Sequence, residues 1–316
     1  MLRYLLSLAL TATNWALSSS NDDILVGGQA VIEGVMMRSP KGYSVAVRRQ
    51  DGTVRVIKDA LLTVGEKWKA FKLPVLRGVG VLGQALVLGI KALRFSAEEA
   101  IAGEGEKQGN AADARKTSNT LIAGNLVLAL GVNVLMFVVL PLFLTRFIQA
   151  ETGFQSSLLF NLVDGFFRVI VFLGFLTMVS LMNDMRRVFQ YHGAEHKTVY
   201  NFEARETLAV ENASKYSTLH PRCGTSFLLV VMTVSIVVFS VAHFDSIGAK
   251  LLSRIVLLPL VAGISYEIIR YSAKHPKNIL RFVTMPGLLL QKITTKEPDK
   301  AQLEIAIRAL EEALTV

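Results

Sequence analysis

The stretch TLIAGNLVLALGVNVLMFVVLPLFL, from Thr120 to Leu144, contains no charged side chain. A bilayer core is crossed by roughly 20 predominantly apolar residues in a helix, so this stretch is long enough to span a membrane. Three further segments have comparable length and apolar character, and they are Leu158–Leu181, Thr225–Phe244 and Leu251–Ile269. The sequence therefore predicts about four transmembrane helices.

The overall composition agrees with this prediction. The chain has 316 residues, of which 52% are hydrophobic and 19% are charged, and its mean hydropathy is +0.44. These values are typical of a polytopic membrane protein in contact with the lipid bilayer. The formal net charge of +9 does not indicate nucleic acid as a partner, because no basic tract is interleaved with aromatic residues.

Lysine and arginine residues predict the orientation of the spans. The connectors Thr145–Gln155 and Asp245–Lys250 are short, which groups the four spans into two hairpins, and they hold few cations. Cations are abundant instead in Val26–Ser118, in Asp184–Gly224 and after Arg270. The positive-inside rule places these three regions in the cytoplasm, with both chain ends on that side.

A small β unit is expected before the first span, in residues 24–59. Tyr43–Arg48 and Thr53–Ile57 alternate apolar and polar residues, and Asp51-Gly52 between them is a hairpin turn signal. Residues 60–118 follow as an interfacial helix and a linker. Within them, the uncharged core Gly78–Ile90 is short for a span, so an interfacial or re-entrant helix is expected.

The remaining divisions follow from the same patterns. The membrane domain covers residues 119–271 and contains the cytoplasmic loop 184–224, and residues 272–316 form a cytoplasmic helical tail whose last helix begins at Pro298. Residues 1–20 contain Arg3 followed by the apolar stretch Leu5–Leu17. These residues are interpreted either as a signal-like segment or as an interfacial anchor, and the charge pattern favours the anchor.

The pentapeptide His192-Gly193-Ala194-Glu195-His196 points to a metal ion. On a helix, His192 and His196 lie one turn apart on one face, at a spacing that lets two imidazoles bind one ion. Glu195 beside them is a candidate general base that takes a proton from water. The pattern H-x-x-E-H is the one that inverted zinc peptidases use, and here it directly follows the second expected span.

Further ligands are available in the same cytoplasmic loop and in the fourth span. His220 and Cys223 have the H-x-x-C spacing that allows both side chains to reach one ion. Glu267, near the cytoplasmic end of the fourth span, is another candidate, and its alternative role is to neutralise Arg270 or Arg222. Imidazole and thiolate ligands favour zinc as the divalent metal.

The glycine-rich stretch 27–40 carries three polar residues, Gln29, Glu33 and Arg38. It lacks the strand–turn–helix context of a dinucleotide-binding loop. Its glycines favour close backbone approach or a bulge, and the functional alternative is that the three polar side chains line the cytoplasmic site.

Five separated motifs resemble those of the YqhQ-like family of bacterial integral membrane proteins. They are GGQAVIEGVMMRSP (27–40), YHGAEHKTVYNFE (191–203), LHPRCGTSF (219–227), YEIIRYSAKH (266–275) and PGLLLQKITTKEPDKAQLEIAIRAL (286–310). The resemblance covers the chain from about residue 26 to its end. It implies a bacterial inner-membrane location and metal-dependent enzymatic activity, but no established substrate, reaction or metal.

Three functions follow from these observations. The first is a metal-dependent hydrolase acting on a membrane-proximal substrate, with His192, His196 and His220 as ligands and Cys223 or Glu267 as a fourth. The second is a membrane scaffold or assembly factor with a closed structural metal site, because four protein ligands leave no open position. The third is a transporter, which the scarcity of ionisable residues in the spans disfavours.

Overall fold

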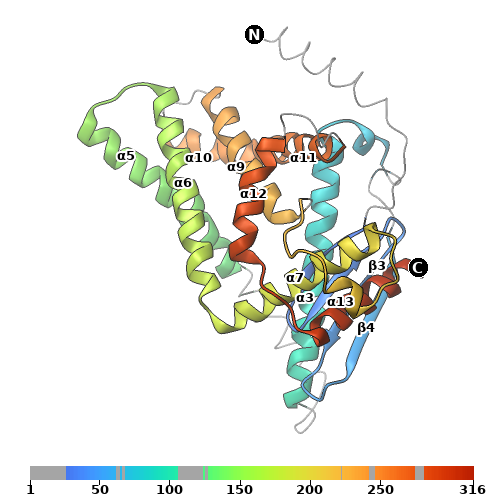
Figure 1. Cartoon of the computed structure of the whole chain (residues 1–316). Helices are drawn as coiled ribbons and strands as arrows, with labels where there is room; N and C mark the ends of the chain where they lie inside the picture. The colour runs from blue at the N-terminus through green and yellow to red at the C-terminus, as the bar shows by residue number, and fades with distance from the viewer. Residues whose placement is uncertain are drawn as a thin grey trace.

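The computed structural model describes residues 26–61, 65, 68–105, 124, 127–221, 223–241, 246–274 and 281–316. The expectations for residues 1–20, and for the linker beyond residue 105, lie outside these residues. Long helices occupy the upper and left parts of the molecule in Figure 1. A small sheet with helices α7 and α13 occupies the lower right.

The sheet is an antiparallel meander of four strands in the order β1-β2-β3-β4. The strands are β1 (Gly27–Val31), β2 (Gly34–Arg38), β3 (Gly42–Arg48) and β4 (Val54–Ala60). The turn between β3 and β4 is the expected one: Gly52 has a φ of 83°, and the Asp51 side chain accepts a hydrogen bond from the Thr53 amide. The predicted N-terminal β unit is confirmed as a sheet.

Both faces of the sheet are covered. On one face, Val35, Met37 and Ala46 pack with residues of α7 (Asn183–Glu203) and α13 (Lys300–Leu314). On the other face, Val45 and Val47 pack with Leu88 and Ala92 of α3 (Leu76–Gly105). Strand β3 is therefore buried on both sides, although its sequence alternates in the manner of a strand with one solvated face.

Three described helices are long and apolar enough to cross a membrane, namely Leu76–Ala100, Val127–Thr152 and Ser157–Ser180. The second contains a π-helical turn (Leu135–Val139) before α5 (Leu140–Thr152), and the third is α6. A fourth candidate is the bent pair of α10 (Ile247–Val256) and α11 (Leu258–Lys274), whose axes differ by 46°. Helix α9 (Gly224–Val241) is apolar but shorter.

Helix α3 differs from the expectation for residues 60–118. It is one continuous helix of 30 residues that follows a short 3-10 helix (Lys69–Lys72), and it includes part of the expected linker. Its uncharged core is short because Arg77, Lys91 and Arg94 interrupt the apolar run, yet Leu76–Ala100 as a whole is apolar enough for a span.

The C-terminal region contains two helices. Helix α12 (Arg281–Thr294) packs against α9 and α6, and it runs downward in Figure 1 towards α7. Helix α13 starts after Asp299, whose side chain forms a capping box with Gln302. Leu303, Ile307 and Leu310 are buried against the sheet, as expected for a docked amphipathic helix.

Candidate metal centre

Helix α7 carries the H-x-x-E-H motif on its buried side. His196 is 1% exposed and Glu195 is 6% exposed, while His192 is half-buried. The rings of the two histidines lie 4.5 Å apart, as expected for residues one turn apart on a helix. The helix therefore presents both imidazoles and the carboxylate to the interior of the protein.

Cys223, directly before α9, completes a group of three side chains that could hold a metal ion. One ligand atom from each of His192, His196 and Cys223 lies within 4.8 Å of the others. The His192 Nε2 and Cys223 Sγ atoms are 3.1 Å apart. Two such ligands of one tetrahedral zinc ion are separated by about 3.6 Å, so a shift of about half an ångström would bring this pair of atoms to that separation.

Backbone carbonyl groups determine which nitrogen of each imidazole is available. The Nδ1 atom of His192 lies 2.8 Å from the Thr294 carbonyl oxygen, and the Nδ1 atom of His196 lies 2.5 Å from that of Thr218. A carbonyl oxygen only accepts, so each Nδ1 carries the proton and each Nε2 presents a lone pair. A hydrogen bond from Nδ1 to a carbonyl oxygen is the contact that commonly orients a metal-bound histidine.

The Nε2 atom of His196 is the most direct sign of a ligand. It is buried and has no hydrogen-bond partner among the described residues. A buried polar atom without a partner costs free energy unless something binds it. A metal ion between His196, His192 and Cys223 would satisfy this atom.

Cys223 lies at the N-terminus of helix α9. Its Sγ atom lies 3.4 Å from the Thr225 amide and 3.2 Å from the Thr225 hydroxyl, at the N-terminus of α9. The N-terminus of a helix stabilises negative charge, and a thiolate is the form of cysteine that binds metal.

His220 lies next to this group but outside it. Its ring is 5.6 Å from that of His196 and its Nε2 atom is 3.5 Å from the Glu203 carboxylate. The Gln291 side chain holds the backbone of His220 through two hydrogen bonds, of 2.7 and 2.8 Å. Burial lowers the pKa of His220, which favours the neutral imidazole.

Glu195 adjoins the three ligands. Its carboxylate lies 3.5 Å from the His196 Nε2 atom. Strand β1 packs directly on it, because a Cβ atom on Gly28 would be 2.9 Å from the Glu195 Cγ atom. The carboxylate is therefore held between strand β1 and the His196 imidazole.

The structure does not bring Glu267 to this group. Both of its carboxylate oxygens accept hydrogen bonds from Arg77, and one also accepts from the Val75 amide. Figure 1 shows α11 and the start of α3 near the top, away from α7. An ion pair is present at Glu267, as the alternative expectation has it, but among the described residues its partner is Arg77 and not Arg270, and Arg222 lies outside the described residues.

The three polar residues of the 27–40 stretch have different environments. Glu33 pairs with Arg187 through contacts of 2.5 and 2.6 Å, and the Tyr191 hydroxyl donates to it over 3.4 Å. Gln29 lies against Gly89 of α3. Arg38 is half-buried, and burial lowers its pKa. The stretch does contact the site, but through Gly28.

Comparison with known proteins places this chain in a family. The model of a family described as "Protein of unknown function (DUF1385)" matches residues 73–316. The chain belongs to the DUF1385 family. It is also 33% identical over 294 residues to "Uncharacterized protein YqhQ" from Bacillus subtilis (strain 168), with 91% of this chain and 92% of that protein covered. The resemblance to the YqhQ-like family is confirmed, and no solved structure matches.

Sequence reasoning missed the groups that hold the ligands of this DUF1385 protein in place. The Thr294 carbonyl comes from the end of α12, about 100 residues after His192. The next part of the chain is fixed to α7 by a 2.9 Å hydrogen bond from the Lys296 amide to the Phe189 carbonyl. Gly193 makes this approach possible, since a Cβ atom there would overlap the Lys296 carbonyl oxygen. Gly193, which lies between the two histidines, was the sequence feature that could have indicated this close approach.

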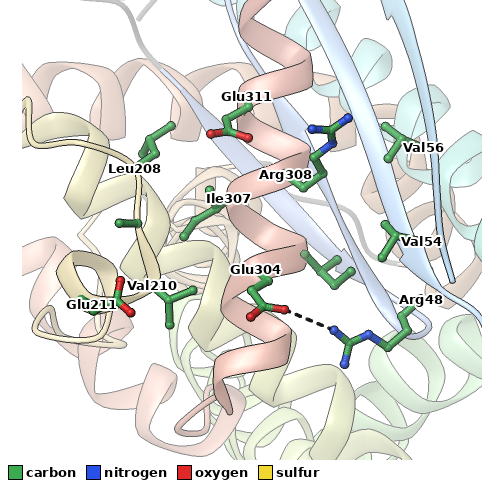
Figure 2. A pocket seen from close by; sticks show the side chains of 12 residues that line it. Arg48, Val54, Val56, Leu208, Val210, Glu211, Glu304, Ile307, Arg308 and Glu311 are labelled. Atoms are coloured by element: carbon green, nitrogen blue, oxygen red, sulfur yellow. Dashed lines mark ion pairs between the residues drawn. The ribbon is translucent and has the colours of Figure 1, made fainter. Parts of the chain in front are cut away.

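A groove of about 700 Å³ in this DUF1385 protein lies elsewhere. Figure 2 shows it along α13, between β4 and the short helix α8 (Val210–Ala213), with a 3.7 Å ion pair between Arg48 and Glu304. Neither histidine nor cysteine lines it. The groove therefore offers none of the chemistry of the metal-binding group.

The separation of Glu267 from the candidate centre leads to a first prediction. We expect Glu267→Gln to leave the zinc affinity of the purified protein unchanged, because the carboxylate binds Arg77 and not the three ligands. Isothermal titration with zinc measures this directly. A drop in affinity of tenfold or more would mean that Glu267 reaches the ion.

Proposed function

We propose that this protein is a metal-dependent hydrolase of the bacterial inner membrane. His192, His196 and Cys223 hold a divalent ion, with zinc favoured by two imidazoles and one thiolate. Glu195 is the general base. The observation that carries this proposal is that His192, His196 and Cys223 each offer a ligand atom within 4.8 Å of the others, while the buried Nε2 atom of His196 has no hydrogen-bond partner among the described residues.

The count of ligands supports a catalytic site over a structural one. Catalytic zinc sites commonly have three protein ligands and one open position, whereas structural sites have four protein ligands. His220, the candidate fourth ligand, is outside the group and its backbone is held by Gln291. The carboxylate of Glu195 adjoins the open position instead.

Each residue then has a chemical role. A zinc ion held by His192, His196 and Cys223 would supply a Lewis acid. Glu195 would accept a proton from a water molecule beside it and would return that proton to a leaving group. Thr294 and Thr218 orient the imidazoles, and the start of α9 stabilises the thiolate of Cys223.

The location of the site suggests the kind of substrate. Helix α7 begins three residues after the apolar helix α6 ends, and Cys223 directly precedes the apolar helix α9. With the basic regions in the cytoplasm, as the positive-inside rule predicts, the site lies at the inner membrane face. A membrane-proximal peptide or lipid headgroup is the substrate class that fits this position.

The scaffold or assembly-factor function, with a closed structural site, is the second candidate. The 5.6 Å between the rings of His196 and His220 favours it, because a modest movement would bring His220 to the ion. The two candidates differ in whether the fourth position holds water or His220.

Cobalt substitution distinguishes the two candidates without knowledge of the substrate. We expect the visible spectrum of the Co²⁺-loaded protein to change with pH, as water in the open position ionises near pH 7. Glu195→Gln should retain the metal and shift this transition. A pH-independent spectrum that is altered by His220→Gln would overturn the hydrolase proposal in favour of the closed site.

A further inference from the structure

Strand β4 forms an open edge of the sheet. It pairs with β3 on one side, and no other described strand pairs with it. Six of its seven residues are exposed, so neither α13 nor α3 covers this edge. An edge strand presents unpaired amide and carbonyl groups, and these can pair with another extended chain.

The pairing of β4 with β3 determines which of its backbone groups point outward. The Arg49 amide donates to the Thr53 carbonyl oxygen over 2.9 Å, and the Leu61 amide donates to the Lys41 carbonyl oxygen over 2.7 Å. Hydrogen-bonded positions alternate along an antiparallel pair, so the odd-numbered residues of β4 direct their amide and carbonyl groups to β3. The even-numbered residues therefore direct theirs to the open edge.

Three consecutive outward positions are available for pairing. They are Val54, Val56 and Lys58, and among the described residues no backbone hydrogen bond reaches their outward groups. The outward amide of Ala60 differs, because it donates to its neighbour's side chain, the Asp59 carboxylate, over 2.8 Å. The edge is thus open along most of the strand.

The groove along α13 adjoins this open edge. Figure 2 shows Val54 and Val56 on its β4 side, Ile307 on α13, and Leu208 and Val210 on the side of α8. Successive side chains of a strand point to opposite faces, so a strand added beside β4 would direct every second side chain towards this groove. The groove offers apolar contacts to those side chains.

The groove also carries negative charge. The two arginines that line it, Arg48 and Arg308, each pair with a glutamate of α13, at 3.7 and 2.7 Å. Glu211 and Glu311 line the groove as well, and among the described residues neither has an ion-pair partner. A basic ligand would complement these two carboxylates.

We propose that the β4 edge and this groove bind an extended, basic peptide segment of a partner protein. Addition of a strand to an open sheet edge is a recurrent mode of peptide recognition, in which backbone pairing supplies affinity and pockets for alternate side chains supply specificity. A lysine or arginine of the peptide would lay its apolar stem on Ile307 and direct its charge to Glu211 or Glu311. The proposal is independent of the metal centre, because none of its three ligands lines the groove.

Binding is measured by fluorescence anisotropy on the full chain in phosphatidylcholine nanodiscs, with empty nanodiscs as the blank. The probe is a labelled peptide of alternating valine and arginine that has seven residues, the length of β4. We expect saturable binding of this peptide. The same peptide with methylated backbone nitrogens cannot donate to β4, and a valine–glutamate peptide has the wrong charge, so neither should bind.

Variants locate the peptide at this edge. Val56→Pro removes an outward amide and retains the pairing with β3, since proline is tolerated on edge strands. We expect it to weaken binding about tenfold or more. Val56→Ala is the matched control, because it shortens the same side chain and keeps the amide, and its affinity should stay within about threefold. A double variant, Glu211→Gln with Glu311→Gln, should weaken binding about fivefold through the loss of two exposed ion pairs.

Several results would overturn the proposal. They are the absence of probe binding, equal binding of the methylated or acidic peptide, and unchanged affinity in a folded Val56→Pro variant. Analytical ultracentrifugation tests a second copy of this chain as the occupant. A wild-type dimer that Val56→Pro converts to a monomer would assign the edge to that second copy and contradict the proposal.

Discussion

Replacement of His196 by alanine is expected to abolish stoichiometric zinc binding. The substitution removes a ligand whose Nε2 atom is buried, unpartnered and aligned by the Thr218 carbonyl. Loss of a group that hydrogen-bonds to a metal ligand typically lowers metal affinity 10- to 100-fold. Loss of a ligand itself should therefore lower it at least about a hundredfold. Isothermal titration of the apo protein with zinc measures the change.

His220→Gln serves as the comparison for this variant. It removes an imidazole that is close to His196 but outside the three-ligand group, so most of the zinc affinity should remain. Circular dichroism and thermal unfolding in chelator establish that both variants fold. Stoichiometric zinc in the folded His196→Ala variant would show that the three-ligand arrangement is wrong.

Gly193→Ala is expected to destabilise the protein strongly, although alanine is the better helix former. A Cβ atom at this position overlaps the Lys296 carbonyl oxygen and approaches the Thr218 side chain to 3.2 Å. Overpacking of this kind costs about 2–3 kcal/mol. The midpoint of thermal unfolding should fall by roughly 5–10 °C.

The same variant should weaken zinc binding, because the displaced segment also carries the Thr294 carbonyl that orients His192. Gly174→Ala is the matched control: it lies in the second half of α6, and no atom lies within 4 Å of the added Cβ. There the gain in helix propensity, about 1 kcal/mol, should leave the protein equally or more stable. Equal midpoints for the two variants would contradict the close contact between α7 and the segment after α12.

The local parts of the fold could be predicted because local patterns determine them. The Asp51-Gly52 turn specified the β3–β4 hairpin, and the apolar run of Ser157–Ser180 specified a candidate span. The course of α12 could not be predicted. Its packing against α9 depends on contacts between distant parts of the chain, and Pro286 within it suggests a break rather than a helix.

The candidate centre could also be predicted only in part. The spacing of His192, Glu195 and His196 follows from helix geometry, and Cys223 was a recognisable ligand beside it. The sequence could not separate Cys223 from His220, because both occupy one turn of a loop whose course depends on Gln291. Nor could it assign Glu267, whose partner Arg77 is 190 residues away.

The central claim is that His192, His196 and Cys223 bind one metal ion. The most direct test is the metal content of the full chain, purified without a metal-affinity tag and measured by inductively coupled plasma mass spectrometry. The account predicts about one zinc per chain in the wild type, and almost none in a folded His192→Ala/His196→Ala double variant. A wild-type protein that carries no zinc, and takes up neither zinc nor cobalt when titrated, would contradict it.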